Sequence, residues 1–471
     1  MSDALPPPVD PLTAGTPPLY PPSVTPPAEP LGFIGFLRRC ADNPLATIPA
    51  AAYRDLVTCL EPFGGFKVLW LADPDAVEGV LVRDAGRFRK TDLETRLFGP
   101  AIGNGILTAE GNDWRWQRRV LAPLFRYSEL LGYVPEMAAA ANEQIERWRR
   151  AATTGAPQLQ AIDRDMTAAT YAVIVRTMLY GGTPRDVDAV MTSGSAYLEG
   201  TSWVLAYGLI GLPGWLPHPA TFKLRRTARA FRSSVAAIIA DRQASGKAAT
   251  DLLGRLLAAR DPETDQPLSR DLLVDNLATL LEAGHETTAQ ALTWSLYLLA
   301  RLPDWQQRIR EEVARVCSNR QIEPDDLDRL VLTERFIKEV MRLYPPAPIL
   351  SRTPREPVVI AGHAIEPGHP VYMPIYAIHR HRALWEDPDR FDPDRFLPER
   401  EAQLKRTQYM PFGAGPRICL GASFAMLEAK TLLASFVRAA RFTWNGRHNP
   451  EPVSRVTLRP RGGMPLLVEL L

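Results

Sequence analysis

The feature that most constrains the fold is a long run of helix-type apolar spacing between Arg270 and Leu302. Apolar residues recur there about every 3.6 positions, and at about 1.5 Å per residue a single helix of this length would cross much of the molecule. The same spacing predicts helices from Tyr133 to Trp148 and from Leu420 to Ala439. Most of the chain is therefore expected to be helical.

Strand signals are short and are grouped toward the two ends of the chain. They comprise Phe66–Leu71, Val358–Ile365, Pro370–Ile375, Val456–Leu458 and Leu466–Val468. The sequence therefore predicts a mainly α fold with a small β-sheet region.

Proline marks the one clear break in composition. Residues 1–30 hold 11 of the 44 prolines, and residues with a fixed φ and no N–H donor favour an extended, poorly packed arm. The alternative interpretation is that this arm binds a partner protein that recognises proline-rich segments. Because 46% of the chain is apolar and 23% is charged, as in ordinary globular proteins, residues 31–471 are expected to form one large domain.

Charge and cysteine usage exclude several classes of protein. Fifty-five basic and 53 acidic residues give a net charge of +2, which argues against nucleic-acid binding. The four cysteines show no C-x-x-C spacing, so neither a zinc site nor a disulfide framework is predicted, and a reducing compartment is favoured. With no signal-peptide pattern and no uninterrupted apolar run of ~18 residues, we expect a cytoplasmic protein with no membrane span.

Cys419 is the residue with the most distinctive chemical setting. It lies in a glycine-rich loop, from Phe412 to Gly421, that leads into a helical pattern. The positive end of that helix and the nearby Arg417 guanidinium are expected to favour the thiolate, the form that a metal or an electrophile needs. On these residues alone, a reactive cysteine and a buried structural cysteine in a tight turn remain equally open.

The residues around this cysteine resemble a known motif. The haem-binding signature of the cytochrome P450 family, Phe-x-x-Gly-x-Arg-x-Cys-x-Gly, is matched by Phe412, Gly415, Arg417, Cys419 and Gly421. The resemblance implies that Cys419 is the proximal ligand of a haem b iron, a ligation that favours O–O cleavage. Gly415 and Gly421 would let backbone N–H groups approach the sulfur, and Phe412 would pack on the porphyrin side of the loop. The implied fold is the cytochrome P450 fold, with the haem between the long central helix and the cysteine-loop helix.

A second family motif lies upstream. Glu339 and Arg342 are three residues apart on one predicted helix face, a spacing that suits a charge-assisted pair but is common on helix surfaces. In the family, an arginine from a later loop completes this pair, and the stretch Phe391–Phe396 supplies Arg395. The resemblance implies a structural ion triad that locks the segment delivering the cysteine loop.

A third motif places polar residues in the middle of the long apolar helix, in the stretch Ala283-Gly284-His285-Glu286-Thr287-Thr288. A buried carboxylate or hydroxyl is costly unless it is hydrogen-bonded, and a threonine can bond back to its own helix carbonyl and bend the helix. A helix-bending polar patch without chemistry is one interpretation.

The resemblance implies instead that this stretch is an oxygen-binding groove. Glu286 and Thr287 would relay protons to the dioxygen. Ala283 and Gly284 would lie against the haem, with Gly284 leaving room for dioxygen beside the helix backbone. His285 falls at a position that the family leaves variable and is expected to point away from the iron.

A cationic turn from Trp114 to Arg119 carries a fourth resemblance. The spacing of Trp114 and Arg118 places them on one side of a helix, and in the family these positions bind a haem propionate. Arg352 and Arg417 would hold the propionates from the other side, because a planar guanidinium matches a carboxylate bidentately. A solvated helix face is the alternative interpretation of the cationic turn.

The family's pocket positions fall mostly on small or apolar residues, so a small apolar substrate is expected. Besides Ala283, they are Phe98, Thr288, Ala347, Ile349 and Met464. For Met464 and the alanines, plain core packing is equally open. The apolar stretch 203–215 is expected to form a mobile roof over the substrate channel, with shallow lipid contact as the alternative.

The resemblance spans residues 31–471 and implies a monooxygenase that uses O2. Electrons would come from a separate partner, such as ferredoxin with its reductase, because no flavin or iron–sulfur motif is present. A basic face that includes Arg115, Arg119, Lys405 and Arg406 would suit an acidic ferredoxin, with ordinary surface charges as the alternative.

Two other functions compete with this one. A peroxide-using or rearranging haem-thiolate enzyme would need no reductase, and a haem-based sensor would not turn over at all. Both are disfavoured by the pair Glu286 and Thr287, because relay groups are needed when dioxygen itself must be protonated.

Overall fold

The computed structural model describes residues 17–29, 31–63, 66–152, 156–179, 189–190, 192–194, 196–197, 200–209, 216–245 and 251–471. Its helices, in chain order, are α1 (Phe33–Asp42), α2 (Pro74–Glu78), α3 (Asp92–Ile102), α4 (Gly111–Leu121), α5 (Tyr127–Leu130), α6 (Val134–Ala151), α7 (Ile162–Met178), α9 (Ser202–Leu209), α10 (Thr221–Ser245), α11 (Leu252–Ala258), α12 (Arg270–Arg301), α13 (Pro303–Cys317), α14 (Val331–Leu343), α15 (Ile375–Ile378), α16 (Pro398–Glu401) and α17 (Ala422–Ala439).

The strands are short and form separate sheets. The largest sheet has the order β1 (Val57–Phe63), β2 (Phe66–Leu71), β8 (Val371–Met373), β5 (Leu350–Pro354) and β3 (Phe88–Arg89). A second sheet joins β4 (Gln158–Ala161), β12 (Pro465–Leu470) and β9 (Ala440–Thr443). Two pairs complete the set, β6 (Val358–Ile360) with β7 (His363–Ile365) and β10 (Pro452–Ser454) with β11 (Leu458–Pro460). The predicted mainly α fold with a small β-sheet region is confirmed.

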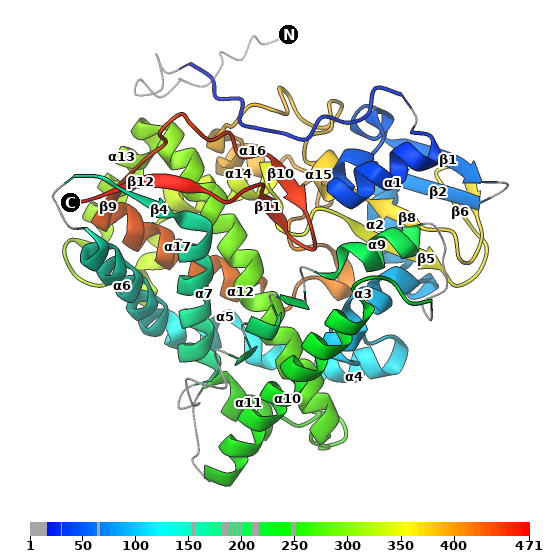
Figure 1. The fold of residues 1–471 in the computed structure, drawn as a ribbon, viewed down its shortest axis with the longest axis horizontal. Coiled ribbons are helices and arrows are strands. Elements are labelled where there is room, and N and C mark those ends of the chain that lie inside the picture. Colours follow the sequence, from blue (N-terminus) through cyan, green and yellow to red (C-terminus); the bar gives the residue numbers. More distant parts are fainter. Residues whose placement is uncertain are drawn as a thin grey trace.

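The central helix α12 organises the helical half of the molecule (Figure 1). It begins after Ser269, whose hydroxyl oxygen accepts a hydrogen bond from the Leu272 N–H at 3.3 Å and so caps the helix. It ends at Arg301, because Pro303 disfavours helical geometry in the residue before it and begins α13 instead. Helices α7, α14 and α17 pack against α12, so that most of its length is buried. The predicted helix is therefore confirmed within one residue at its end.

The strand predictions are only partly right. Phe66–Leu71 is β2, but β4 lies in the middle of the sequence, which the expected grouping toward the two ends did not include. The predicted strand Val456–Leu458 is shifted, because Val456 and Thr457 belong to the turn between β10 and β11 and line a cavity. Val456 faces the cavity, so its apolar side chain does not indicate the alternation of a strand.

The proline arm differs from its prediction where it is described. Residues 17–27 form no helix or strand, but they pack on the body of the protein instead of standing away from it. The Leu19 carbonyl accepts from the Phe391 N–H at 3.0 Å, the Pro22 carbonyl accepts from the Tyr344 hydroxyl at 2.8 Å, and Val24 is buried. The expectation of a poorly packed arm is therefore wrong for these residues, because specific donors from the body satisfy its carbonyls. Residues 1–16 and Pro30 lie outside the described part.

Candidate functional site

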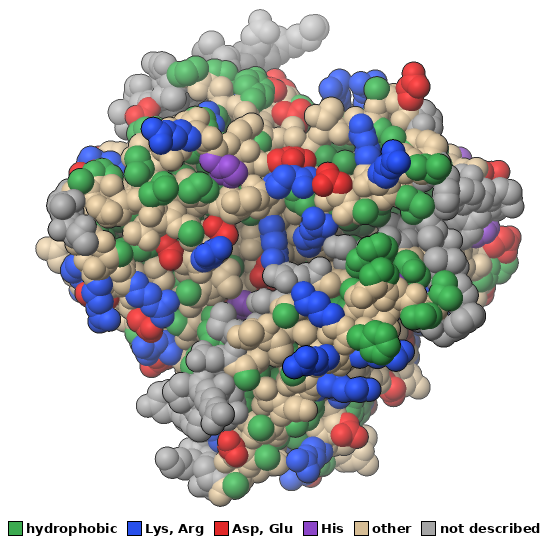
Figure 2. Space-filling model, viewed as in Figure 1, with side chains coloured by type: hydrophobic (Ala, Val, Ile, Leu, Met, Phe, Trp, Pro, Cys, Tyr) green, Lys and Arg blue, Asp and Glu red, His purple; other side chains and the backbone are tan. Residues whose placement is uncertain are grey.

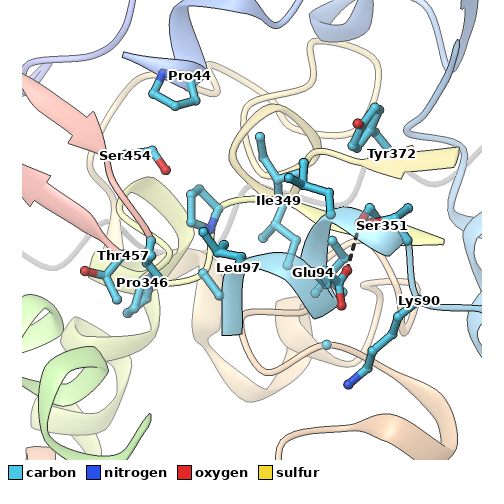
Figure 3. Close-up of a pocket in the computed structure, with 18 of the residues that line it drawn as sticks. Pro44, Lys90, Glu94, Leu97, Pro346, Ile349, Ser351, Tyr372, Ser454 and Thr457 are labelled. Carbon is cyan, nitrogen blue, oxygen red and sulfur yellow. Dashed lines mark hydrogen bonds between the residues drawn. The ribbon is translucent and has the colours of Figure 1, made fainter. Parts of the chain in front are cut away.

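One large cavity lies between the middle of α12, α3, strand β5 and the cysteine loop, with a volume of about 1320 Å³. Figure 3 shows side chains from several separate segments converging on it, among them Leu97 and Glu94 of α3, Ile349 and Ser351 around β5, and Thr457 of the β10–β11 turn. The cavity therefore joins elements that are far apart in the sequence.

The cysteine loop is a tightly folded segment that forms one wall of this cavity. The Cys419 N–H donates to the Phe412 carbonyl at 2.9 Å, which closes the loop. Gly415 adopts a φ of +73°, and a Cβ there would lie 1.9 Å from the Leu81 carbonyl oxygen. Gly415 is thus required for close packing against the short helical segment Gly79–Arg83, which contains Leu81. The expectation that Gly415 lets a backbone N–H group approach the sulfur stays a prediction.

The thiol of Cys419 faces the cavity, and its exposed surface belongs to the cavity wall. Burial within the protein raises its pKa, while a hydrogen bond from the Gly421 N–H and the positive charge of Arg118 act in the opposite direction. The expectation that Arg417 favours the thiolate is therefore wrong. Arg417 is occupied elsewhere, and Arg118, which donates to the neighbouring Ile418 carbonyl at 3.0 Å, is the guanidinium that acts on the sulfur.

The predicted ion triad is assembled in the structure. Glu339 and Arg342 are fully buried and pair bidentately, with Oε2 to Nε at 2.7 Å and Oε1 to Nη2 at 2.8 Å. Arg395 lies 3.6 Å from the same carboxylate. Arg342 also donates to the carbonyls of His379, Pro388 and Arg390 at 2.7–2.9 Å, which fixes the long segment before the cysteine loop.

His379 connects the ion triad to the segment that leads into the cysteine loop. Its Nε2 accepts from the Met410 N–H at 3.0 Å, two residues before Phe412, while its Nδ1 lies 3.2 Å from the Arg342 carbonyl. Burial and the adjacent Arg342 charge lower the pKa of His379 to about 3, so the ring is neutral and can accept at Nε2. The sequence carried no signal for this role, because His379 acts through backbone groups of distant residues.

The predicted oxygen groove lies on the cavity face of α12. Ala283 and Thr287 line the cavity, and the Thr287 hydroxyl donates to the Ala283 carbonyl at 2.9 Å. His285 is buried, with Nδ1 at 2.8 Å from the Leu281 carbonyl, and does not line the cavity, in line with its expected direction. Gly284 also lines the cavity, and its role beside dioxygen stays a prediction. A Cβ there would lie 2.9 Å from Ile174 of α7, so its small size also serves helix packing.

Glu286 is held more firmly than a free relay group would be. Its Oε1 accepts from Arg459 at 2.9 Å, from the Thr457 hydroxyl at 2.8 Å and from Gln290 at 3.1 Å. Arg459, in β11, was not predicted from the sequence. The carboxylate therefore joins α12 to the β10–β11 turn at the edge of the cavity.

Basic side chains line the cavity near the cysteine loop. Trp114, Arg118, Arg352 and Arg417 all belong to this wall, and the Arg417 guanidinium stacks on Trp114 at 4.5 Å from the ring centre. Lys90 was missed by the sequence interpretation, and burial lowers its pKa to about 8. Figure 3 shows its ammonium group inside the cavity.

The wall suits a haem. The positive charges of Arg118, Arg352, Arg417 and Lys90 outnumber the neighbouring acids Glu94 and Glu110, which leaves positive charge for two propionates. Cys419 presents a sulfur that already accepts one backbone hydrogen bond, as a thiolate ligand requires. The residues present therefore fit an iron porphyrin with a cysteine ligand.

The predicted pocket residues separate into two groups. Phe98, Thr288, Ala347 and Ile349 line the cavity. Met464 does not, because its side chain is packed in the hydrophobic core and its N–H donates to Asp163 at 2.8 Å. Met464 as a pocket residue is therefore wrong, and the core interpretation holds.

The predicted roof is only partly described. Leu205 of α9 lines the cavity, whereas residues 210–215 lie outside the described part of the chain. Apolar side chains gather on the outer surface in the region of α9 and α3 (Figure 2). Trp203 is 46% exposed there. No helix among the described residues is long and apolar enough to cross a bilayer.

The predicted basic face contains several paired charges. Arg119 forms a bidentate pair with Asp261, and Lys405 lies 2.7 Å from Asp75. Arg115 donates to the amide oxygen of Asn112 at 3.0 Å and has no acidic partner among the described residues. The positive character of this face is thus weaker than the sequence suggests.

Comparison with known proteins places this chain in a family. The family model described as cytochrome P450 matches residues 53–466. The cyclooctatin synthase of Streptomyces melanosporofaciens is 33% identical over 428 residues, which cover 90% of this chain and 88% of that protein. A cytokinin hydroxylase of Arabidopsis thaliana is 30% identical over 421 residues, which cover 86% and 79%. The solved haem domain of cytochrome P450DA matches 96% of this chain and 97% of its own, with a TM-score of 0.81 and 26% identity.

Proposed function

Because the chain belongs to the cytochrome P450 family and has its fold, we propose that it oxidises a small apolar substrate with O2 and electrons from a separate redox partner. The observation that supports this proposal most is the shared cavity, which brings Cys419 and Thr287 to the walls of one largely apolar space. The four free cysteines favour a cytoplasmic location.

The proposed cofactor is haem b. Cys419 would bind the iron, Arg118, Arg352 and Arg417 would hold the propionates with Trp114, and Lys90 would add a fourth cation. When bound, a haem with a thiolate ligand supplies the activation of O2.

The protein's own part in the reaction is to supply protons and to shape the pocket. The Thr287 hydroxyl hydrogen-bonds to the Ala283 carbonyl at the cavity wall, and rotation of the hydroxyl would let it donate into the cavity. Glu286, one residue earlier, accepts from Thr457 and Arg459, and would keep the polar edge of the helix in place beside that hydroxyl.

Thr287→Ala is expected to lower product formation about 100-fold while O2 continues to be consumed, because a positioned proton donor is lost. The measurement is product formed per O2 consumed, with a reductase and any substrate that turns over. Thr287→Ser keeps the hydroxyl and should restore most of the coupling. Equal coupling in wild type and Thr287→Ala would remove Thr287 from the proton path.

A peroxide-using enzyme is the second candidate, and the tight hold on Glu286 favours it. A carboxylate that accepts from Arg459, Thr457 and Gln290 is less able to pass protons than a free one. Comparison of turnover with reductase and O2 against turnover with hydrogen peroxide decides between the two. Faster turnover with peroxide, and none with reductase, would contradict the monooxygenase proposal.

The partner is proposed to be an acidic ferredoxin that docks on the basic face. Changing Arg115 and Lys405 together to glutamate should lower the electron-transfer rate at low salt about tenfold, because long-range attraction speeds association, and high salt should reduce the difference. The control is the same pair of charge reversals, to glutamate, at the exposed Arg229, on α10, and Arg447, after β9. Equal rates for the Arg115/Lys405 variant and wild type at low salt would exclude this face as the docking site.

A further inference from the structure

Glu282 is an acidic residue in the cavity wall that the mechanism above does not use. It lies on α12 one helical turn before Glu286 and lines the cavity. A Cβ at Gly194 would lie 2.5 Å from the Glu282 Oε2, so the absence of a side chain at Gly194 makes room for this carboxyl group. A glutamate fitted this closely is part of the wall and does not belong to the outer surface.

The carboxyl group of Glu282 lacks a full set of partners. Its Oε1 is buried and has no hydrogen-bond partner in the described part of the chain. The Tyr197 hydroxyl, whose pKa is raised by burial and by the Glu282 charge, is engaged elsewhere, because it donates to the Leu97 carbonyl at 2.7 Å. A buried polar atom without a partner is costly, so this oxygen is suited to a donor from a ligand.

The charges around Glu282 also leave one acid uncompensated. The charges of His285, Glu286 and Arg459 affect the pKa of Glu282, and the charge of Glu282 affects the pKa of Tyr197. Arg459 is paired with Glu286 at 2.9 Å, and His285 places Nδ1 against the Leu281 carbonyl. Two carboxyl groups therefore share one guanidinium. Burial raises the pKa of Glu282, as expected for an acid without its own counter-ion.

Glu282 and the basic side chains of the cavity come from different elements. The cations Lys90, Arg118, Arg352 and Arg417 belong to the wall near the cysteine loop, whereas Glu282 lies on α12 and packs against Gly194. Apolar side chains such as Leu97, Phe98, Leu205 and Ile349 also line the cavity. These lining residues would suit a ligand with an apolar body and one positively charged hydrogen-bond donor.

We propose that Glu282 anchors a substrate that carries a protonated amine on an apolar body. The ammonium group would donate to the Glu282 carboxylate and supply the positive charge that this corner lacks. This inference rests on the proposed function, since it names the class of substrate for the same cavity. It predicts that the cavity prefers a cationic ligand over an anionic ligand of the same length.

The test is calorimetric titration of the haem-loaded protein with N,N-dimethyldecylamine and with decanoic acid, without turnover. Wild type should bind the amine more tightly than the acid, and Glu282→Gln should weaken amine binding about 10- to 100-fold, the range expected for one charge-assisted hydrogen bond. Decanoic acid should bind Glu282→Gln no more weakly than wild type. Glu386→Gln, at an exposed glutamate outside the cavity wall, is the matched control and should leave amine binding unchanged.

The pH dependence of binding gives a second readout. A cation favours the ionised form of Glu282, so amine affinity should rise as pH increases through the pKa of that carboxyl group, and fall once the amine itself loses its proton. The rising limb should disappear in Glu282→Gln. Equal amine affinity in wild type and Glu282→Gln would overturn the proposal, as would tighter binding of decanoic acid by wild type. Amine binding that weakens as expected in Glu282→Gln, in a protein whose wild type turns over no substrate with reductase and O2, would count against the proposed function alone.

Discussion

Glu339→Ala is expected to lower the free energy of unfolding by about 3–5 kcal/mol, the cost of leaving one member of a buried ion pair without its partner. Arg342 is fully buried, and in the variant its guanidinium would keep only the carbonyls of His379, Pro388 and Arg390 as acceptors. The Asp392 N–H would lose its acceptor as well, since it donates to Glu339 at 2.8 Å. The urea midpoint of the haem-loaded protein, followed by circular dichroism, measures the loss.

An exposed pair with the same spacing provides the control. Glu146 and Arg149 lie three residues apart on α6 and form an ion pair with both side chains about half exposed. Glu146→Ala should cost less than about 1 kcal/mol, because solvent screens such pairs. If Glu339→Ala cost no more than Glu146→Ala, the triad would not lock the segment that precedes the cysteine loop.

The elements that could be predicted from sequence are those whose signal is local. The run from Arg270 gives α12 because its periodicity and the stop at Pro303 are contained in one segment. Cys419, Arg118 and Arg352 reach the same cavity as expected, because motif spacing fixes their place in the fold.

The features that could not be predicted depend on contacts between distant segments. Arg459 pairs with Glu286 across 173 positions of sequence, and nothing in either segment marks the other. Lys90 and Glu282 face the cavity as single residues without a motif. Gly284 shows the same limit, since nothing near it in the sequence predicts that Ile174 of α7 lies 2.9 Å from the position of a Cβ there.

Cys419→Ala is expected to have the largest effect of any substitution on the haem site. No other cysteine lines the cavity among the described residues: Cys40 and Cys317 are buried elsewhere, and Cys59 lies in β1. No other thiol among the described residues could therefore replace the lost ligand. The variant should lose the thiolate-ligated state completely and retain haem poorly. Loss of haem alone would not identify the ligand, so the ligation of the haem that remains must be measured.

The most direct test of the central claim is the visible spectrum of the reduced protein with carbon monoxide. Wild type and the control variant Cys59→Ala should both show the red-shifted band of a thiolate-ligated haem, and Cys419→Ala should lack it. A thiolate band that persists in Cys419→Ala would show that another group holds the iron, and would contradict the assignment of Cys419 as the ligand.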